Sequence, residues 1–199
     1  MVRLVLESDQ LREFPVGEFS DHYVKLQLPP PGASYEVPFD PVEVRERLDK
    51  SEWHRQRTYT VRDADPAAGT ITIDFVTHGS GLAGPWARNA RPGDLVQLVG
   101  PGGAYSPDPD ADWHLLAGDD AAIPAISVAL SRITPDRKTF VILEVEDQQY
   151  ALDPLKTNSS RDYQDRAVGA IGQRRFAGTE LLGPPIGFGP ELGKDQLWF

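Results

Sequence analysis

The sequence has no cysteine among its 199 residues. Disulfides, thiolate metal ligands and cysteine nucleophiles are therefore excluded, and a reducing compartment such as the cytoplasm is compatible with the chain. The sequence also lacks a long hydrophobic run: its longest mostly apolar stretch, AAIPAISVAL, contains Pro124 and is far shorter than the ~20 residues of a bilayer-spanning helix. Its first residues lack the apolar core of a signal peptide. We therefore expect a cytoplasmic protein without membrane insertion.

Positive charge is scarce in the chain. It carries 20 Lys and Arg residues against 30 Asp and Glu residues, which gives a formal net charge of -10. Such a charge repels nucleic acid phosphates and anionic membrane surfaces, so we expect no nucleic-acid partner. An anionic ligand would have to meet a local basic site.

Turn-forming residues, by contrast, are abundant. The 18 Gly and 18 Pro residues predict many turns and favour β structure. Short segments with alternating apolar residues fill residues 1–107 and predict an antiparallel barrel or sandwich. A short helix is expected at 42–48, with Asp40 as its N-cap and Pro41 at its first position. The expected strands are 2–6, 22–28, 57–62, 70–77 and 95–99.

The pattern changes after an acidic linker near residue 107. Residues 113–133, WHLLAGDDAAIPAISVALSRI, predict a strand, a turn and a helix, and KTFVILEV predicts a second buried strand. Together they indicate a βαβ unit, so a second, α/β domain is expected over residues 108–155. Residues 156–199 have weak periodicity and many Gly, Pro and Arg residues, and we expect an atypical, poorly packed tail there.

The strand RTYTVR carries the first candidate binding residues. In a strand, Arg57 and Tyr59 share one face, and Thr58 and Thr60 share the other. A guanidinium offers a planar fork to a phosphate, a tyrosine offers an aromatic face, and Thr60 can hydrogen-bond a ring edge. This pattern suits a phosphate-bearing aromatic cofactor. The alternative is a strand of ordinary strand-forming residues flanked by solvated arginines.

The second candidate is the segment 74–87, DFVTHGSGLAGPWA, in which a strand leads through a glycine loop into a short helix. Unpaired N–H groups at a helix N-terminus favour a pyrophosphate, and Gly79, Gly81 and Gly84 would let it approach closely. Glycines after a strand are also common turn residues. His78 taken alone is more often a hydrogen-bonded structural histidine than a catalytic one.

Separated motifs then follow one another along the chain: DHYVKLQLPPPG, RTYTVR, DFVTHG, GPWA, RPGDLVQLVGPGGAY and WHLLAGDDAAIPAI. In this order they resemble the siderophore-interacting proteins, which are FAD-dependent ferric-siderophore reductases of the ferredoxin-reductase superfamily. The resemblance extends over about residues 1–155. It implies a β + α/β fold in which an antiparallel FAD-binding β-barrel is followed by a partial α/β nicotinamide-binding domain.

The resemblance also implies a set of cofactor-binding residues. Arg57 would contact the FAD pyrophosphate, Tyr59 would pack along the flavin, and Thr60 would lie near its reactive edge. The implied cofactor-binding positions are Arg57, Thr58, Tyr59, Thr60, Asp74, Phe75, Val76, Thr77, His78, Gly84, Pro85, Trp86 and Ala87. No catalytic side chain and no resident metal are expected.

Electrons would pass from NAD(P)H, or from a ferredoxin, through FAD to a ferric siderophore and release Fe(II). Lys25 and Arg91 are candidate contacts for an anionic siderophore, although such side chains are more often simply solvated. The segment AGDDAAIPAI, residues 117–126, would be the turn and helix of the nicotinamide domain. It is not a GxGxxG fingerprint, an ordinary βα unit remains open, and Asp119 and Asp120 would repel a phosphate that faced them.

Relative to the family pattern, Met1 falls inside the first barrel strand, and the resemblance fades after residue 155. We therefore expect a chain that is shortened at both ends. Two functions follow as hypotheses. The first is a flavoprotein reductase of ferric siderophores, and the second is a flavin- or siderophore-binding module without turnover.

Overall fold

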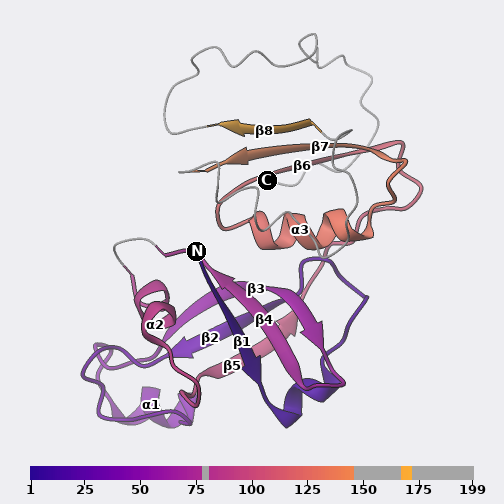
Figure 1. Cartoon of the computed structure of the whole chain (residues 1–199). Coiled ribbons are helices and arrows are strands. Elements are labelled where there is room, and N and C mark those ends of the chain that lie inside the picture. Colours follow the sequence, from indigo (N-terminus) through magenta and orange to yellow (C-terminus); the bar gives the residue numbers. More distant parts are fainter. Residues whose placement is uncertain (78–80, 146–166, 172–199) are drawn as a thin grey trace. The chain divides into compact units, whose positions relative to one another are not determined.

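The computed structural model in Figure 1 describes residues 1–77, 81–145 and 167–171. The chain divides into two compact units. Unit 1 is Met1–Ser106, and unit 2 is Pro107–Phe199.

Unit 1 is built on an antiparallel sheet of five strands in the order β1-β4-β3-β2-β5. The strands are β1 (Val2–Glu7), β2 (Tyr23–Leu28), β3 (Arg55–Asp65), β4 (Thr70–Phe75) and β5 (Gln97–Gly102). This confirms the expected antiparallel β domain. The prediction that this sheet closes into a barrel is wrong for the part of the chain that the structure describes. There, β1 pairs only with β4 and β5 only with β2, so the two edge strands do not pair with each other.

Three short helices accompany this sheet: the 3-10 helix η1 (Asp9–Glu13), α1 (Pro41–Arg47) and α2 (Ala83–Asn89). The predicted start of α1 is confirmed, because the Asp40 carboxylate accepts hydrogen bonds from the amides of Val42 and Glu43 at 2.7 and 3.3 Å. In Figure 1, α2 lies beside the sheet, and it contacts β1 and β4.

The core of unit 1 follows the period-two pattern of the strands. Every second residue of β2 and β4 is almost fully buried, as predicted for strands with one face on a core. These residues are Val24, Leu26, Leu28, Ile71, Ile73 and Phe75. The hairpin of β3 and β4 is confirmed, and β3 is longer than predicted because DAD continues the strand. The turn ends at Gly69, which has φ +74° and whose Cβ, if present, would lie 2.9 Å from the Ser8 carbonyl oxygen.

Unit 2 contains a parallel sheet in the order β6-β7-β8. The strands are β6 (Trp113–Asp119), β7 (Lys138–Glu144) and β8 (Ala167–Ile171), and α3 (Ile123–Arg132) connects the first two. The predicted βαβ unit is confirmed, because β6 and β7 pair in parallel. β8 lies within the segment expected to pack poorly. Its sequence AVGAI is a short, mostly apolar run without alternation, which suits a parallel strand although it shows no periodicity.

Candidate functional site

Arg57 and Tyr59 lie on the same face of β3. Arg57 is opposite Leu26 and Tyr59 is opposite Val24 in the register with β2, and both of these partners are buried in the core. Arg57 and Tyr59 therefore lie on the face of the sheet that carries the core, but the Arg57 guanidinium is exposed to solvent. Arg57 donates one hydrogen bond from Nη1 to the Gln56 carbonyl oxygen at 2.7 Å. The described ion pairs of the chain do not include it.

An aromatic row extends from this face across three elements. The Tyr59 ring of β3 lies 4.4 Å from the Phe75 ring of β4, and the Phe75 ring lies 5.8 Å from the Trp86 ring of α2, measured between centroids. Phe75 is 0% exposed, whereas Tyr59 and Trp86 are half-buried. The structure thus brings together three predicted site residues that come from three separate motifs. Phe75 supports the two outer rings from within the core.

The Tyr59 hydroxyl stays protonated at neutral pH. Burial raises the pKa of Tyr59 above its ordinary value, and the nearby Arg57 guanidinium acts in the opposite direction. The phenol therefore remains a hydrogen-bond donor beside a permanent positive charge.

The side chains of Thr58 and Thr60 lie on the opposite face of β3. Thr58 is opposite Lys25, and Thr60 is opposite Tyr23, in the same register. Alternation along the strand separates all of these side chains from the Arg57–Tyr59 face. The structure therefore does not bring Lys25 or the Thr60 hydroxyl to Arg57.

Asp74 holds two strands together. Its side chain is 2% exposed and accepts two hydrogen bonds from Arg3 of β1, from Nε at 2.7 Å and from Nη2 at 2.8 Å. The bond to Asp74 raises the pKa of Arg3, whereas partial burial lowers it. The Asp74 carboxylate, which was expected to line the cofactor, is thus engaged by an arginine that sequence reasoning missed. A lone charged residue at the second position of the strand 2–6 was the available signal.

The remaining predicted cofactor positions follow β4 or belong to α2. Val76, Thr77, Pro85 and Trp86 are half-buried, and Gly84 and Ala87 are buried. Three of the predicted residues of the glycine loop fall around the break in the described chain: Gly81 is exposed, whereas His78 and Gly79 lie outside the described residues. α2 has no side-chain cap at Leu82.

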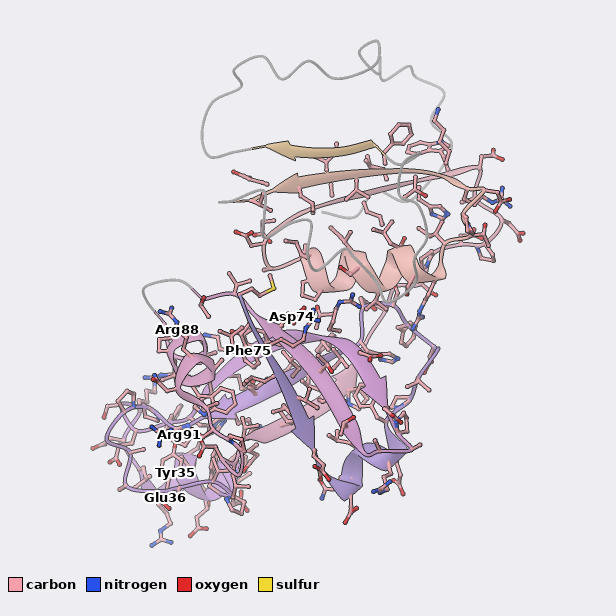
Figure 2. All side chains as sticks on the ribbon, in the orientation of Figure 1. Tyr35, Glu36, Asp74, Phe75, Arg88 and Arg91 are labelled. Carbon is pink, nitrogen blue, oxygen red and sulfur yellow. The ribbon has the colours of Figure 1, made fainter. Side chains whose placement is uncertain are left out.

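Arg91 lies in the loop after α2. Its amide donates to the Asp94 carboxylate at 2.8 Å, and its side chain is exposed. Figure 2 shows Arg91 and Phe75 at separate places in unit 1, so the structure does not unite Arg91 with the aromatic row.

The turn between β6 and α3 is closed by a carboxylate. Asp119 Oδ1 accepts hydrogen bonds from the amides of Ala121 and Ala122 at 2.9 and 3.3 Å. Gly118 permits the tight turn, because a Cβ there would lie 2.3 Å from the Ala122 Cβ. The amides that a phosphate would use at such a turn are therefore occupied by a side chain of like charge.

A second arginine accompanies Arg57 on its face. Arg55 is opposite Leu28, two positions from the Arg57–Leu26 pair, and it is exposed. Sequence reasoning began the strand at Arg57 and missed Arg55, although it continues the same period of two.

The described residues hold no group of three or more His, Cys, Asp or Glu side chains that could bind a metal ion. Among the described helices, none has the length and apolar character needed to cross a membrane.

Comparisons with known proteins identify the family of this chain. Residues 1–105 match the model of the siderophore-interacting FAD-binding domain, and residues 111–166 match the model of the siderophore-interacting protein. An uncharacterized protein of Mycobacterium tuberculosis is 44% identical over 73% of this chain and 52% of its own length. The ferric vibriobactin reductase ViuB of Vibrio cholerae is 38% identical over 74% of this chain and 54% of its own length. The NADPH-dependent ferric-chelate reductase of Escherichia coli is 32% identical over 81% of this chain and 59% of its own length.

Among solved structures, the siderophore-interacting protein SipS from Aeromonas hydrophila aligns with a TM-score of 0.63 and 28% identity, over 85% of this chain and 60% of SipS. The chain spans about half the length of the first curated relatives it matches. The matched motifs, the two family models and the shared fold confirm the resemblance drawn from the sequence. The chain therefore belongs to the siderophore-interacting FAD-binding family.

Proposed function

We propose that unit 1 binds FAD on the Arg57–Tyr59 face and that the chain serves, in the cytoplasm, as a flavoprotein that passes electrons from NAD(P)H to a ferric siderophore. One observation carries the proposal: an exposed arginine outside the described ion pairs and a row of three aromatic side chains meet on one face of a domain that matches an FAD-binding model. The printed names of two relatives, a ferric vibriobactin reductase and a ferric-chelate reductase, support the substrate class.

The residues present fit such a cofactor. Arg57 offers a planar fork to a diphosphate in a chain whose net charge is -10 and would otherwise repel it. Tyr59 offers a half-buried ring and a protonated hydroxyl to an isoalloxazine. Phe75 packs against the Tyr59 ring from the core and holds the Tyr59 ring in place. When bound, FAD accepts a hydride from a nicotinamide and releases the two electrons one at a time, which matches the one-electron reduction of Fe(III). The protein's contribution is to bind, orient and partly shield the cofactor.

A binding module without turnover is the second candidate. The observation that favours it lies in unit 2, where the Asp119 carboxylate accepts hydrogen bonds from the Ala121 and Ala122 amides in the turn before α3. A nicotinamide dinucleotide could then place its diphosphate at this turn only by displacing a carboxylate of the same charge. FAD binding in unit 1 does not depend on that turn.

The two functions differ in one redox experiment. The purified chain is loaded with FAD, freed of unbound flavin, made anaerobic and mixed with NADPH or NADH in a stopped-flow instrument. A reductase loses the visible flavin absorption and, after a ferric siderophore is added, forms Fe(II) that a ferrous chelator traps. A module keeps its flavin oxidised under the same conditions. A chain that takes up no FAD contradicts both functions.

Substitution locates the site in the same preparation. Arg57→Ala should weaken FAD binding by about tenfold or more, because one charge-assisted fork to the diphosphate is lost. Arg47→Ala is the matched control, because Arg47 is an exposed arginine that already pairs with Glu43 on α1. Equal FAD affinity of the folded Arg57→Ala variant and the control would remove Arg57 from the site.

A further inference from the structure

Arg55, Arg57 and Tyr59 form one line along β3. Their partners in β2 are Leu28, Leu26 and Val24, so all three side chains start from the same face of the sheet. Residues two apart in a strand are separated by about 6.6 Å, a distance that two arginine side chains can close on one diphosphate. The guanidinium groups of Arg55 and Arg57 therefore follow one another along β3, beside the ring of Tyr59.

Neither arginine of this line is neutralised by a carboxylate in the described chain. The described ion pairs belong to Arg3, Arg12 and Arg47, and each of these pairs with an Asp or a Glu. Acidic residues outnumber basic ones in the sequence, so two arginines on one face of β3 that take no part in the described ion pairs form a local basic site against the overall charge.

Glu52, three positions before Arg55 in the sequence, is engaged by Ser34. It accepts hydrogen bonds from the Ser34 amide at 3.2 Å and the Ser34 hydroxyl at 2.6 Å. Glu52 therefore holds the segment between β2 and β3 in place, and the described ion pairs do not join it to Arg55.

Tyr35 packs in the segment between β2 and β3. Tyr35 is half-buried, donates its hydroxyl to the Glu52 carbonyl oxygen at 2.7 Å and packs edge-on against Phe39, with 4.9 Å between ring centroids. Burial raises the pKa of the Tyr35 hydroxyl, Glu52 adds to the rise, and Arg55 opposes it.

We propose that Arg55 is a second diphosphate contact, so that the Arg55–Arg57 pair selects a dinucleotide flavin over a mononucleotide one and directs its adenosine half along β3, from Arg57 toward Arg55. This inference rests on the proposed binding of FAD by Arg57 and Tyr59. A monophosphate held at Arg57 leaves Arg55 without a partner, whereas a diphosphate gives each guanidinium its own phosphate group. Arg55 then contributes to FAD affinity and little to FMN affinity.

Flavin titrations of the full chain test the proposal. FAD, FMN and riboflavin are titrated separately into flavin-free protein, with flavin fluorescence as the readout, for wild type, Arg55→Gln, Arg55→Lys and Arg57→Gln. Arg47→Gln is the control for loss of an exposed arginine, and circular dichroism and the melting temperature establish that each variant is folded. Titrations at low and high salt report how much of the affinity is electrostatic.

We expect Arg55→Gln to weaken FAD binding about tenfold and to change FMN and riboflavin binding less than about twofold. Arg55→Lys should recover part of the loss, because it restores the charge without the fork. Arg57→Gln should weaken FAD and FMN alike. The salt dependence of FAD binding should be smaller in Arg55→Gln than in wild type.

The outcomes separate the inference from the proposed function. If wild type binds FAD, Arg57→Gln weakens that binding and Arg55→Gln leaves it unchanged, the inference is overturned and the proposed function stands. An equal loss of FAD and FMN affinity in Arg55→Gln also overturns the selection of a dinucleotide. If wild type binds no FAD, the proposed function and the inference are overturned together.

Discussion

Removing Arg3 should destabilise unit 1 more than neutralising its partner Asp74. The two side chains share two hydrogen bonds, but Arg3 is 54% exposed and Asp74 is 2% exposed. Arg3→Met strands a buried carboxylate, which costs about 3–5 kcal/mol for a fully buried pair. Solvent reaches the Arg3 side, so we expect about 2–3 kcal/mol here. Asp74→Asn leaves an amide oxygen to accept one hydrogen bond and an arginine that water can solvate, and it should cost about 1 kcal/mol.

Urea unfolding measured by circular dichroism gives these free energies, provided that the slope with denaturant is unchanged. The double variant Arg3→Met/Asp74→Asn should lose at least about 1 kcal/mol less than the sum of the single losses, because no buried charge remains in it. FAD affinity of Asp74→Asn should stay within about twofold of wild type.

Two results would refute this reasoning. Equal losses in the two single variants would mean that Asp74 is not the buried, dependent partner. A large loss of FAD affinity in a stable Asp74→Asn variant would return Asp74 to the cofactor site.

Further substitutions test the aromatic row, the α3 turn and a buried histidine. Tyr59→Ala should lose about 2 kcal/mol of stability and bind FAD more weakly, whereas Tyr59→Phe should keep its stability within about 0.5 kcal/mol; urea unfolding and flavin titration measure both. Gly118→Ala should lower the melting temperature of unit 2, because its Cβ would meet that of Ala122 at 2.3 Å, and adding Ala122→Gly should restore it. Burial, and then Arg45, lower the pKa of His54, so the unfolded chain binds this proton more readily and the free energy of unfolding should fall as the pH drops below about 6.5. His54→Phe should reduce that loss by up to about 1.4 kcal/mol per pH unit, and identical pH profiles of the two proteins would contradict the assignment.

Local rules were enough for β2, β4 and the start of α1 in unit 1. The alternation in β2 and β4 could be predicted because one face of each strand is buried in a single core. The start of α1 could be predicted because Asp40 caps the helix and Pro41 begins it, and both effects are confined to the first turn. β8 escaped prediction because a short, mostly apolar parallel strand carries no period.

Contacts between residues that are far apart in the sequence could not be predicted from local patterns. Arg3 and Asp74 are 71 positions apart, and only the register of β1 with β4 brings them face to face. The row of Tyr59, Phe75 and Trp86 likewise depends on how α2 meets the sheet. The motifs supplied these residues, and the fold shows that Phe75 is buried between the rings of Tyr59 and Trp86, whereas Lys25 lies opposite Thr58, on the other face of β3 from Arg57.

FAD uptake by the purified chain tests directly whether Arg57 belongs to a flavin site. The purified chain is incubated with excess FAD and desalted, and its visible absorption spectrum is compared with those of Arg57→Ala and Arg47→Ala prepared in the same way. We expect flavin absorption close to one FAD per chain in wild type and Arg47→Ala, and clearly less in Arg57→Ala. A colourless wild-type protein, or equal flavin content in all three, would contradict it.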